Sequence, residues 1–410
     1  MKTYYVSPNG AGNAHGHDYE NAIPFERISR LMGRVRDSDN IILIADQGPY
    51  LIDTSVNLYS SGKDGSPITI SGSSRSGHPQ NALFVGDRSP IFSVDNPPGT
   101  EVFRLNTGTA FLEFQNLAFE NISNAFSITG KVHDITFENM EARNVSRFLE
   151  NTACCNQTEA SAENLVIRGI KVSGFSKGVI RLRYDTQNVM IDNVHGDSLQ
   201  TDGANFAMGI HLGGTVHDVV IQNSSMGNIK DSVGGRYWNG DGFATERDAY
   251  NIIIENSCSY NNTDSGFDIK SRNTKLENVT AESNTRNFRF WSDITVTNLT
   301  GTNPRYHGGS SRFPANVWLG ENVTVTIRNS DFLDDDDYGY LFDLREAGSQ
   351  LTIEHVRTNQ VDSGIDGDPR AIAIGSQSVI IGMTTPIVTR QSGSQNSTPS
   401  NLSNGVDDEW

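Results

Sequence analysis

The sequence predicts an all-β protein that folds as a right-handed parallel β-helix. Three observations favour this fold. Short apolar segments ending in Asn recur along the chain, no amphipathic helix lies between them, and only 36% of the 410 residues are hydrophobic while 39 are glycine. A thin, repeated interior with many turns is typical of a solenoid, in which each turn buries its apolar face against the next.

The segment PFERISRLMGRV, from Pro24 to Val35, differs from the repeats that follow it. Its apolar residues recur at helical spacing, and proline is favoured in the first turn of a helix. We therefore expect residues 24–35 to form an amphipathic helix that caps the N-terminal end of the solenoid.

The repeated unit is a β-branched strand followed by Asn, as in VVIQN and IIIEN. Asn tolerates the left-handed backbone of a tight turn, so the recurring Asn is predicted to be structural. Its positions are Asn116, Asn139, Asn193, Asn223, Asn256, Asn278, Asn298 and Asn329. We expect one β-helix domain over residues 1–390 and a loosely attached polar tail over residues 391–410.

The formal charge of −17 disfavours nucleic acid as a partner, because the chain has no basic excess to neutralise phosphates. An acidic polymer would be repelled too, unless a bound cation or a local cluster of Arg and Lys reverses the field. No apolar stretch has membrane-spanning length, so no membrane association is expected. We expect free cysteines, a monomer and a secreted location, although no signal peptide is visible in the sequence.

Stacking the repeats predicts a surface on the later strands. The apolar residue after each Gly or its equivalent should point inward, and this set is Ile180, Ile210, Phe243, Phe267 and Phe288. The next residues then point outward and form the column Arg181, His211, Ala244, Asp268 and Arg289. Two residues further along each strand, a second column reads Arg183, Gly213, Glu246, Lys270 and Trp291. Charged groups beside an aromatic plane suit a saccharide.

Three carboxylates stand beside glycines at the beginnings of neighbouring strands. They are Asp241 in NGDGF, and Asp264 and Asp268 in TDSGFD. Carboxylate oxygens converging where the backbone can approach closely are suited to Ca²⁺. The sequence thus predicts a calcium site, with Asx turns as the alternative explanation of each aspartate.

The opening YYVSPNG, the helix-like PFERISRLMGRV and the pairing of NGDGFA with NNTDSGFDIKS resemble the family 9 polysaccharide lyases. These parallel β-helix enzymes cleave pectate-type polyuronates by calcium-assisted β-elimination. The resemblance covers the layout as far as Trp291, and its specific part runs from Asn239 to Phe290. It implies calcium bound by Asp241, Asp264 and Asp268.

Two positions depart from the family pattern. Ser265 replaces the second aspartate of a doublet, which predicts modest calcium affinity. Arg289 stands where the family carries the lysine that removes the proton, and arginine is a weak candidate for a base because it is effectively always protonated. Lys270 is the competing base, since burial beside a cation can lower the pKa of a lysine.

The resemblance predicts a lyase for an acidic polysaccharide, with calcium neutralising the uronate carboxylate. Around the base we expect contacts to neighbouring sugars, with the tryptophans and tyrosine as stacking walls. These are Arg181, Arg183, His211, Tyr237, Trp238, Glu246 and Trp291.

Three alternatives stay open. A uronate C5-epimerase would need a second acid or base, which His211 or Tyr237 could supply. A glycoside hydrolase would use two carboxylates, Asp241 with Glu246 or Asp268. The third is a non-catalytic β-helix that only binds glycans.

Overall fold

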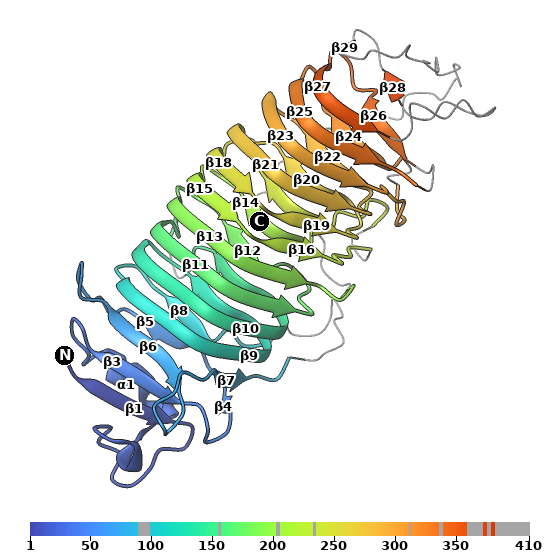
Figure 1. The fold of residues 1–410 in the computed structure, drawn as a ribbon. Coiled ribbons are helices and arrows are strands. Elements are labelled where there is room, and N and C mark those ends of the chain that lie inside the picture. Colours follow the sequence, from blue (N-terminus) through green and yellow to red (C-terminus); the bar gives the residue numbers. More distant parts are fainter. Residues whose placement is uncertain are drawn as a thin grey trace.

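The structure is a computed structural model, which describes residues 1–88, 99–154, 157–201, 206–232, 235–310, 313–335, 339–358, 372–374 and 379–381. It confirms the predicted parallel β-helix. Strands of successive turns lie side by side along one long axis, from β1 near the N-terminus to β27 (Figure 1). Within the described ranges, no helix is long and apolar enough to cross a membrane.

The strands form three faces of the solenoid, and neighbours on each face run parallel. The first face contains β1 (Thr3–Ser7), β3 (Asn40–Ile44), β6 (Ile68–Ser73), β15 (His217–Gln222), β18 (Tyr250–Glu255) and β29 (Val379–Ile381). The second contains β4 (Tyr50–Leu51), β7 (Ala82–Val85), β16 (Ser225–Gly227) and β19 (Cys258–Tyr260). The VVIQN and IIIEN segments pair in parallel, with Val219 opposite Ile252, as the solenoid requires.

The third face is called the site sheet below. It contains β5 (Val56–Leu58), β8 (Phe103–Leu105), β12 (Ile180–Leu182), β14 (Met208–Leu212), β17 (Asp241–Thr245), β20 (Ser265–Ile269), β22 (Arg286–Phe290), β24 (Ala315–Leu319), β26 (Tyr340–Leu344) and β28 (Ile372–Ile374). Longer strands bend around the solenoid and belong to more than one face. They are β9 (Ala110–Ile128), β10 (Val132–Asn151), β11 (Ala162–Ser173), β13 (Gln187–Asp197), β21 (Arg272–Glu282), β23 (Ile294–Thr302), β25 (Thr324–Leu333) and β27 (Gln350–Thr358).

The recurring Asn residues lie where the long strands bend or, for Asn223 and Asn256, between two short strands. All eight predicted positions have left-handed backbones, with φ between 50° and 58°. Their side chains also bond from turn to turn, since Asn298 Nδ2 donates to Asn278 Oδ1 at 2.9 Å and Asn278 Nδ2 to Asn256 Oδ1 at 3.3 Å. The prediction that these residues are structural is confirmed, because all eight adopt the left-handed backbone that the turns require.

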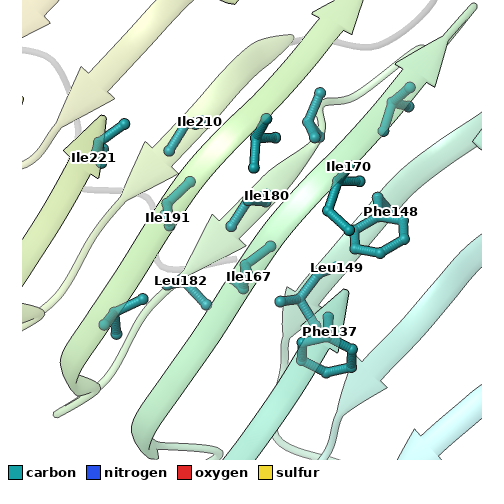
Figure 2. Close-up of a cluster of buried hydrophobic side chains, with 14 of the residues drawn as sticks. Phe137, Phe148, Leu149, Ile167, Ile170, Ile180, Leu182, Ile191, Ile210 and Ile221 are labelled. Atoms are coloured by element: carbon teal, nitrogen blue, oxygen red, sulfur yellow. The ribbon is translucent and has the colours of Figure 1, made fainter. Parts of the chain in front are cut away.

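The interior is a continuous stack of apolar side chains. The five residues predicted to point inward are at most 1% exposed, and the ring of Phe267 stacks on Phe243 at 4.9 Å and on Phe288 at 5.5 Å. Figure 2 shows the same arrangement nearer the middle of the solenoid, where Ile180 and Ile210 from neighbouring turns lie in the cluster. Burial of this row fixes the register, because a slip by one residue would expose it.

The N-terminal cap is shorter than predicted. Pro24 belongs to the short strand β2 (Ile23–Pro24), which pairs with β1, and a 3₁₀ turn (Phe25–Arg27) precedes the helix α1 (Ile28–Met32). A second 3₁₀ turn, Tyr19–Asn21, precedes β2. The strand pairing holds Pro24 extended, so helix can begin only after it. The predicted apolar set is nevertheless buried as expected of a cap, from Phe25 to Val35. The predicted tail, residues 391–410, lies outside the described residues.

Candidate functional site

The site sheet carries the predicted first column in the predicted order. Parallel pairing joins Arg181 to His211, His211 to Ala244, Ala244 to Asp268, and Asp268 to Arg289. The same register extends the column to Glu150 before Arg181 and to Trp318 after Arg289. Rungs are about 4.8 Å apart, so residues far apart in sequence form one continuous strip.

The second column begins where the strands end. Backbone hydrogen bonds continue the register there, from Lys270 N to Thr245 O at 3.2 Å and from Trp291 N to Ile269 O at 2.9 Å. The side chains of this column meet those of the first, and the predicted residues His211, Glu246, Asp268, Lys270, Arg289 and Trp291 therefore join one network.

Asp264 is fully buried and is surrounded by donors. Its Oδ1 accepts a hydrogen bond from Arg286 Nη1 at 2.8 Å, and its Oδ2 accepts from Arg289 Nη1 at 3.1 Å. The Tyr237 hydroxyl also donates to Oδ2. Both oxygens of this carboxylate are therefore used by the protein's own cationic and hydroxyl groups.

Asp268 is enclosed in a similar way. Its Oδ1 accepts from Trp291 Nε1 at 2.7 Å, and its Oδ2 lies 3.2 Å from Lys270 Nζ. Arg289 Nε is 3.9 Å from Oδ1. Asp268 thus holds a tryptophan and two cations on one face of the sheet.

Asp241 is the third carboxylate of this group, and it is fully buried. Its Oδ1 accepts from the backbone N of Ser265 at 2.8 Å, whereas its Oδ2 has no hydrogen-bond partner among the described residues. Burial raises the pKa of Asp241 well above its ordinary value, and the charges of Asp264 and Asp268 raise it further. Burial and the two neighbouring charges therefore disfavour the ionised form of Asp241.

The three carboxylates do not fit a calcium ion in this arrangement. Four of their six oxygens face Arg, Lys, Trp or Tyr donors, which a cation would have to displace, and Asp241 is stabilised in its protonated form. Ca²⁺ binds six to eight oxygen ligands and favours ionised carboxylates. Within the described ranges, no three His, Cys, Asp or Glu residues form a metal-binding group. Arg286, which was absent from the predicted site, and Arg289 supply the positive charge instead.

Lys270 bridges the two columns. Its Nζ lies 3.0 Å from Glu246 Oε1 and 3.2 Å from Asp268 Oδ2, and these two charges raise its pKa despite the opposing effect of burial. Arg289 behaves in the same way, because Asp264 and its neighbours raise its pKa against burial. The expectation that the pKa of Lys270 falls towards neutrality is therefore wrong for this arrangement. Both predicted bases are held as cations.

His211 lies beside them and has the opposite property. Burial lowers its pKa below the ordinary 6.5, the contact with Glu246 opposes this shift, and the charges of Arg181 and Lys270 add to it, so the neutral ring is favoured at pH 7. Its Nε2 is 3.3 Å from Glu246 Oε1. The pKa of Glu246 is lowered to about 2 by His211 and Lys270 in spite of burial, so Glu246 is an acceptor only.

This contact determines the tautomer of His211. Nε2 must carry the proton that it donates to Glu246, which leaves the lone pair on Nδ1. Among the described residues Nδ1 has no hydrogen-bond partner, and it is not one of the fully buried polar atoms. His211 is thus a neutral proton acceptor at the surface of the site.

A second group of charges lies upstream on the site sheet. It is called the upstream cationic cluster and contains Arg147, Lys177, Arg181 and Arg183, with the carboxylate of Glu150. Arg147 Nη1 is 3.0 Å from Glu150 Oε2, and Arg183 Nη2 donates to Thr152 Oγ1 at 3.0 Å. Arg181 and Arg183 were predicted, whereas the other three were missed. Glu150 could have been predicted from the register of the strands, because it pairs with Arg181 one rung earlier.

Aromatic side chains lie at the other end of the column. Arg289 sits over the ring of Trp291 at 4.4 Å and over that of Trp318 at 4.8 Å. Trp318 was missed, although it continues the first column by one rung. Tyr237 joins the site through its hydroxyl. Trp238 packs against Gly308 and Gly309 so closely that a Cβ on either glycine would clash with the indole of Trp238. The structure therefore does not support Trp238 as a free stacking wall.

Comparisons with known proteins support the fold. No family model and no curated protein matches the chain. Among solved structures, pectate lyase Pel9A is similar over 90% of this chain and 82% of its own, with a TM-score of 0.52 and 16% identity. The periplasmic alginate epimerase AlgG is similar over 79% of this chain and 77% of its own, with a TM-score of 0.50 and 11% identity. The catalytic domain of a GH87 α-1,3-glucanase, solved with nigerose, is similar over 84% of this chain and 64% of its own, with a TM-score of 0.53 and 10% identity.

Proposed function

We propose that the protein is a polysaccharide lyase that cleaves a uronate-containing polysaccharide by β-elimination, with His211 as the proton acceptor. The observation that carries the proposal is a neutral imidazole whose tautomer is held by Glu246 and which lies between two cations, Arg181 and Lys270. Removal of a proton beside a carboxylate needs such a pair, a base that is unprotonated at neutral pH and cations that neutralise the acid group. Pectate lyase Pel9A shares the fold, and membership of family 9 is part of this proposal.

The proposed reaction uses the side chains as follows. Arg181, on the rung next to His211, binds the uronate carboxylate and stabilises the negative charge that develops when the C5 proton leaves. His211 Nδ1 takes that proton, the C4–O bond breaks with its electron pair, and a C4=C5 double bond forms. The departing oxygen takes a proton from Lys270, which its carboxylate partners keep protonated. No step is assigned to calcium, because the carboxylates predicted to hold it are occupied by protein donors.

Arg289, Tyr237 and Trp291 have a binding role in this proposal. Arg289 is three rungs from His211, too far to share its proton, and its guanidinium is stacked on two indoles. A positive group over aromatic planes suits a neighbouring acidic sugar. The predicted role of Arg289 as the base is therefore replaced by substrate binding.

One observation favours a hydrolase as the second candidate. Burial and the charges of Asp264 and Asp268 raise the pKa of Asp241, and an acid with a raised pKa beside a carboxylate is the pair that glycosidases use. Against this, Asp241 is 0% exposed and so cannot reach a glycosidic oxygen without displacement of the residues that cover it.

The products separate the candidates. The chain is incubated with a panel of polyuronates, and ultraviolet absorbance, reducing ends and sugar stereochemistry are measured together. A lyase gives unsaturated ends that absorb in the ultraviolet. A hydrolase gives saturated reducing ends, an epimerase changes C5 configuration without cleavage, and a binding protein changes nothing. Saturated products on every polyuronate would contradict the proposal.

A further inference from the structure

A groove on the second face of the solenoid, away from the site sheet, has no role in the proposed reaction. Its volume is about 500 Å³, which is within the usual range of ligand sites in proteins. It crosses parallel rungs of β9, β10, β11, β13, β16 and β19, which strand pairing places side by side. An extended ligand in this groove would therefore contact several rungs at once.

The groove is hollow because small side chains alternate with long ones on its outward positions. Ala118, Ser173 and Ser225 line it where a longer side chain would fill the space. Tyr260 forms a wall at one end, and its ring lies against Gly227 on the preceding rung, where a Cβ would come within 2.2 Å of that ring. Glycine at this position therefore leaves the tyrosine the space that it occupies.

Three long charged side chains of the groove have no partner in the part of the chain that the structure describes. Glu141, Arg143 and Lys171 are all exposed there. Glu141 and Lys171 stand opposite each other on neighbouring rungs, yet their side chains form no ion pair. On the first face the same two strands also oppose Glu138 and Arg168, and these side chains do pair, at 3.0 Å. The charges of the groove are therefore available to a ligand.

The charges of the groove alternate in sign. Glu120 pairs with Arg143 across neighbouring rungs, as Glu141 does with Lys171, so a carboxylate and a cation stand side by side in both outward columns. A polyanion drawn to the cations would be repelled by the two carboxylates. A neutral sugar instead has hydroxyl groups that donate to carboxylates and accept from Arg and Lys. The pattern therefore favours an uncharged ligand rich in hydroxyl groups.

Two other polar side chains of the groove are used by the protein itself. His195 Nδ1 lies 2.7 Å from Ser225 Oγ, and its Nε2 lies 2.8 Å from Asn193 Oδ1. Both carboxylate oxygens of Asp197 accept from Asn228 Nδ2 at 3.0 Å. These bonds hold the floor of the groove and leave ligand contacts to the exposed charges.

We propose that this groove is a second glycan-binding site, which holds a stretch of uncharged sugars and has no catalytic role. Glu141 and Lys171 bind sugar hydroxyl groups from one outward column, Arg143 binds them from the other, and Tyr260 bounds the site at one end. The site rests on the proposed function only for the uronates of the polymer. It makes the preferred polysaccharide one that carries neutral sugars as well, because the second face holds these while the site sheet acts on uronates.

The test is calorimetric titration in a His211→Asn background, which keeps an acidic probe from being consumed. The probes are hexasaccharides of galactose, arabinose, xylose, mannose and glucose, and a heptamer of galacturonate. Glu141→Gln and Arg143→Gln each remove one charge of the groove. Glu163→Gln and Arg34→Gln are the matched controls, because both residues are exposed, have no ion pair within the described ranges, and lie on β11 at the first face and beside the N-terminal cap.

At least one neutral probe should bind, and Glu141→Gln and Arg143→Gln should each weaken its binding about tenfold, as loss of a charge-assisted hydrogen bond implies. The two controls should leave its affinity unchanged. The galacturonate heptamer should not displace it, because the groove and the site sheet are on different faces. Should either variant fail to fold, as judged by circular dichroism, Lys171→Gln is measured in its place.

Absence of binding by every neutral probe would overturn the proposal, as would equal affinity of the parent and both variants. A loss of affinity for the galacturonate heptamer alone would show that the groove binds acidic sugars, and would overturn it as well. Neutral binding that falls in the variants, together with a chain of the original sequence that forms no unsaturated product, would leave the groove standing and refute the lyase proposal alone.

Discussion

The upstream cationic cluster and the carboxylate cluster of Asp241, Asp264 and Asp268 lie on the same sheet but treat positive charge in opposite ways. Upstream, burial and then the charges of neighbouring arginines lower the pKa of Lys177 and Arg181. Three and four rungs beyond Arg181, neighbouring carboxylates raise the pKa of Lys270 and Arg289 against the effect of burial. The difference shows that the solenoid fixes the position of a side chain, while its burial and its neighbours on adjacent rungs decide in which direction its pKa shifts.

His211 lies at the boundary of the two clusters, and its replacement should have the largest effect. His211→Asn removes the proton acceptor, so kcat on the best polyuronate should fall by about 10² to 10⁴, with a smaller change in KM. The measurement is the rate of unsaturated product. His195→Asn is the control, because His195 is a partly buried histidine on the second face, bonded to Ser225 and Asn193. A near-normal kcat for His211→Asn would show that His211 is not the proton acceptor.

The ion pairs of the carboxylate cluster predict a large loss of stability when one carboxylate is neutralised. Asp264→Asn removes the charge that faces Arg286 and Arg289 in a buried site, so the free energy of unfolding should fall by roughly 3 to 5 kcal/mol. Chemical denaturation measures it. Asp331→Asn removes the partner of Arg357 in an exposed ion pair and should lower the free energy of unfolding far less, because solvent screens that pair. Equal losses in the two variants would show that the buried cations are not held by Asp264.

The pH profile tests the state of His211. Because its folded pKa is lowered, the base stays neutral as pH falls through 6.5, and the acid limb of kcat/KM should lie below that value. The same shift makes the unfolded chain bind a proton more tightly, so His211 contributes stability above pH 6.5 that is lost as pH falls through the window below it. An acid limb above pH 6.5 would mean that a cationic imidazole, and not a neutral one, is present in the free protein.

The smallest expected effect is on the stability of the upstream cluster. Lys177→Gln removes a charge that its neighbours repel, so the free energy of unfolding should change by less than about 0.5 kcal/mol or increase slightly. Lys270→Gln takes a cation from Glu246 and Asp268 and should destabilise the fold by about 1 to 3 kcal/mol. Thermal and denaturant unfolding of the two variants give the comparison. A larger loss of unfolding free energy in Lys177→Gln than in Lys270→Gln would contradict the difference drawn between the two clusters.

The fold and the register could be predicted because both follow from local rules. The apolar residue after each glycine or its equivalent must be buried, and Asn must occupy the turns, so the predicted column from Arg181 to Arg289 is correct residue by residue. The cap was overestimated, since no pattern in the sequence shows that Pro24 pairs with β1.

The electrostatics of the site could not be predicted in the same way. Arg286 occupies the same strand position as Ser265 on the preceding rung, and only the stacked rungs bring its guanidinium onto Asp264. Tyr237 reaches that carboxylate from the segment before β17. Both contacts span more than twenty residues, and together they turn a predicted calcium site into an ion-paired one.

The central claim is tested most directly by following ultraviolet absorbance when the chain, treated with a chelator, is mixed with a polyuronate at neutral pH, beside the His211→Asn variant. The account predicts unsaturated product from the chelated parent chain, at a rate that added calcium leaves unchanged, and almost none from the variant. Product that forms only after calcium is restored, or that forms equally well in His211→Asn, would contradict it.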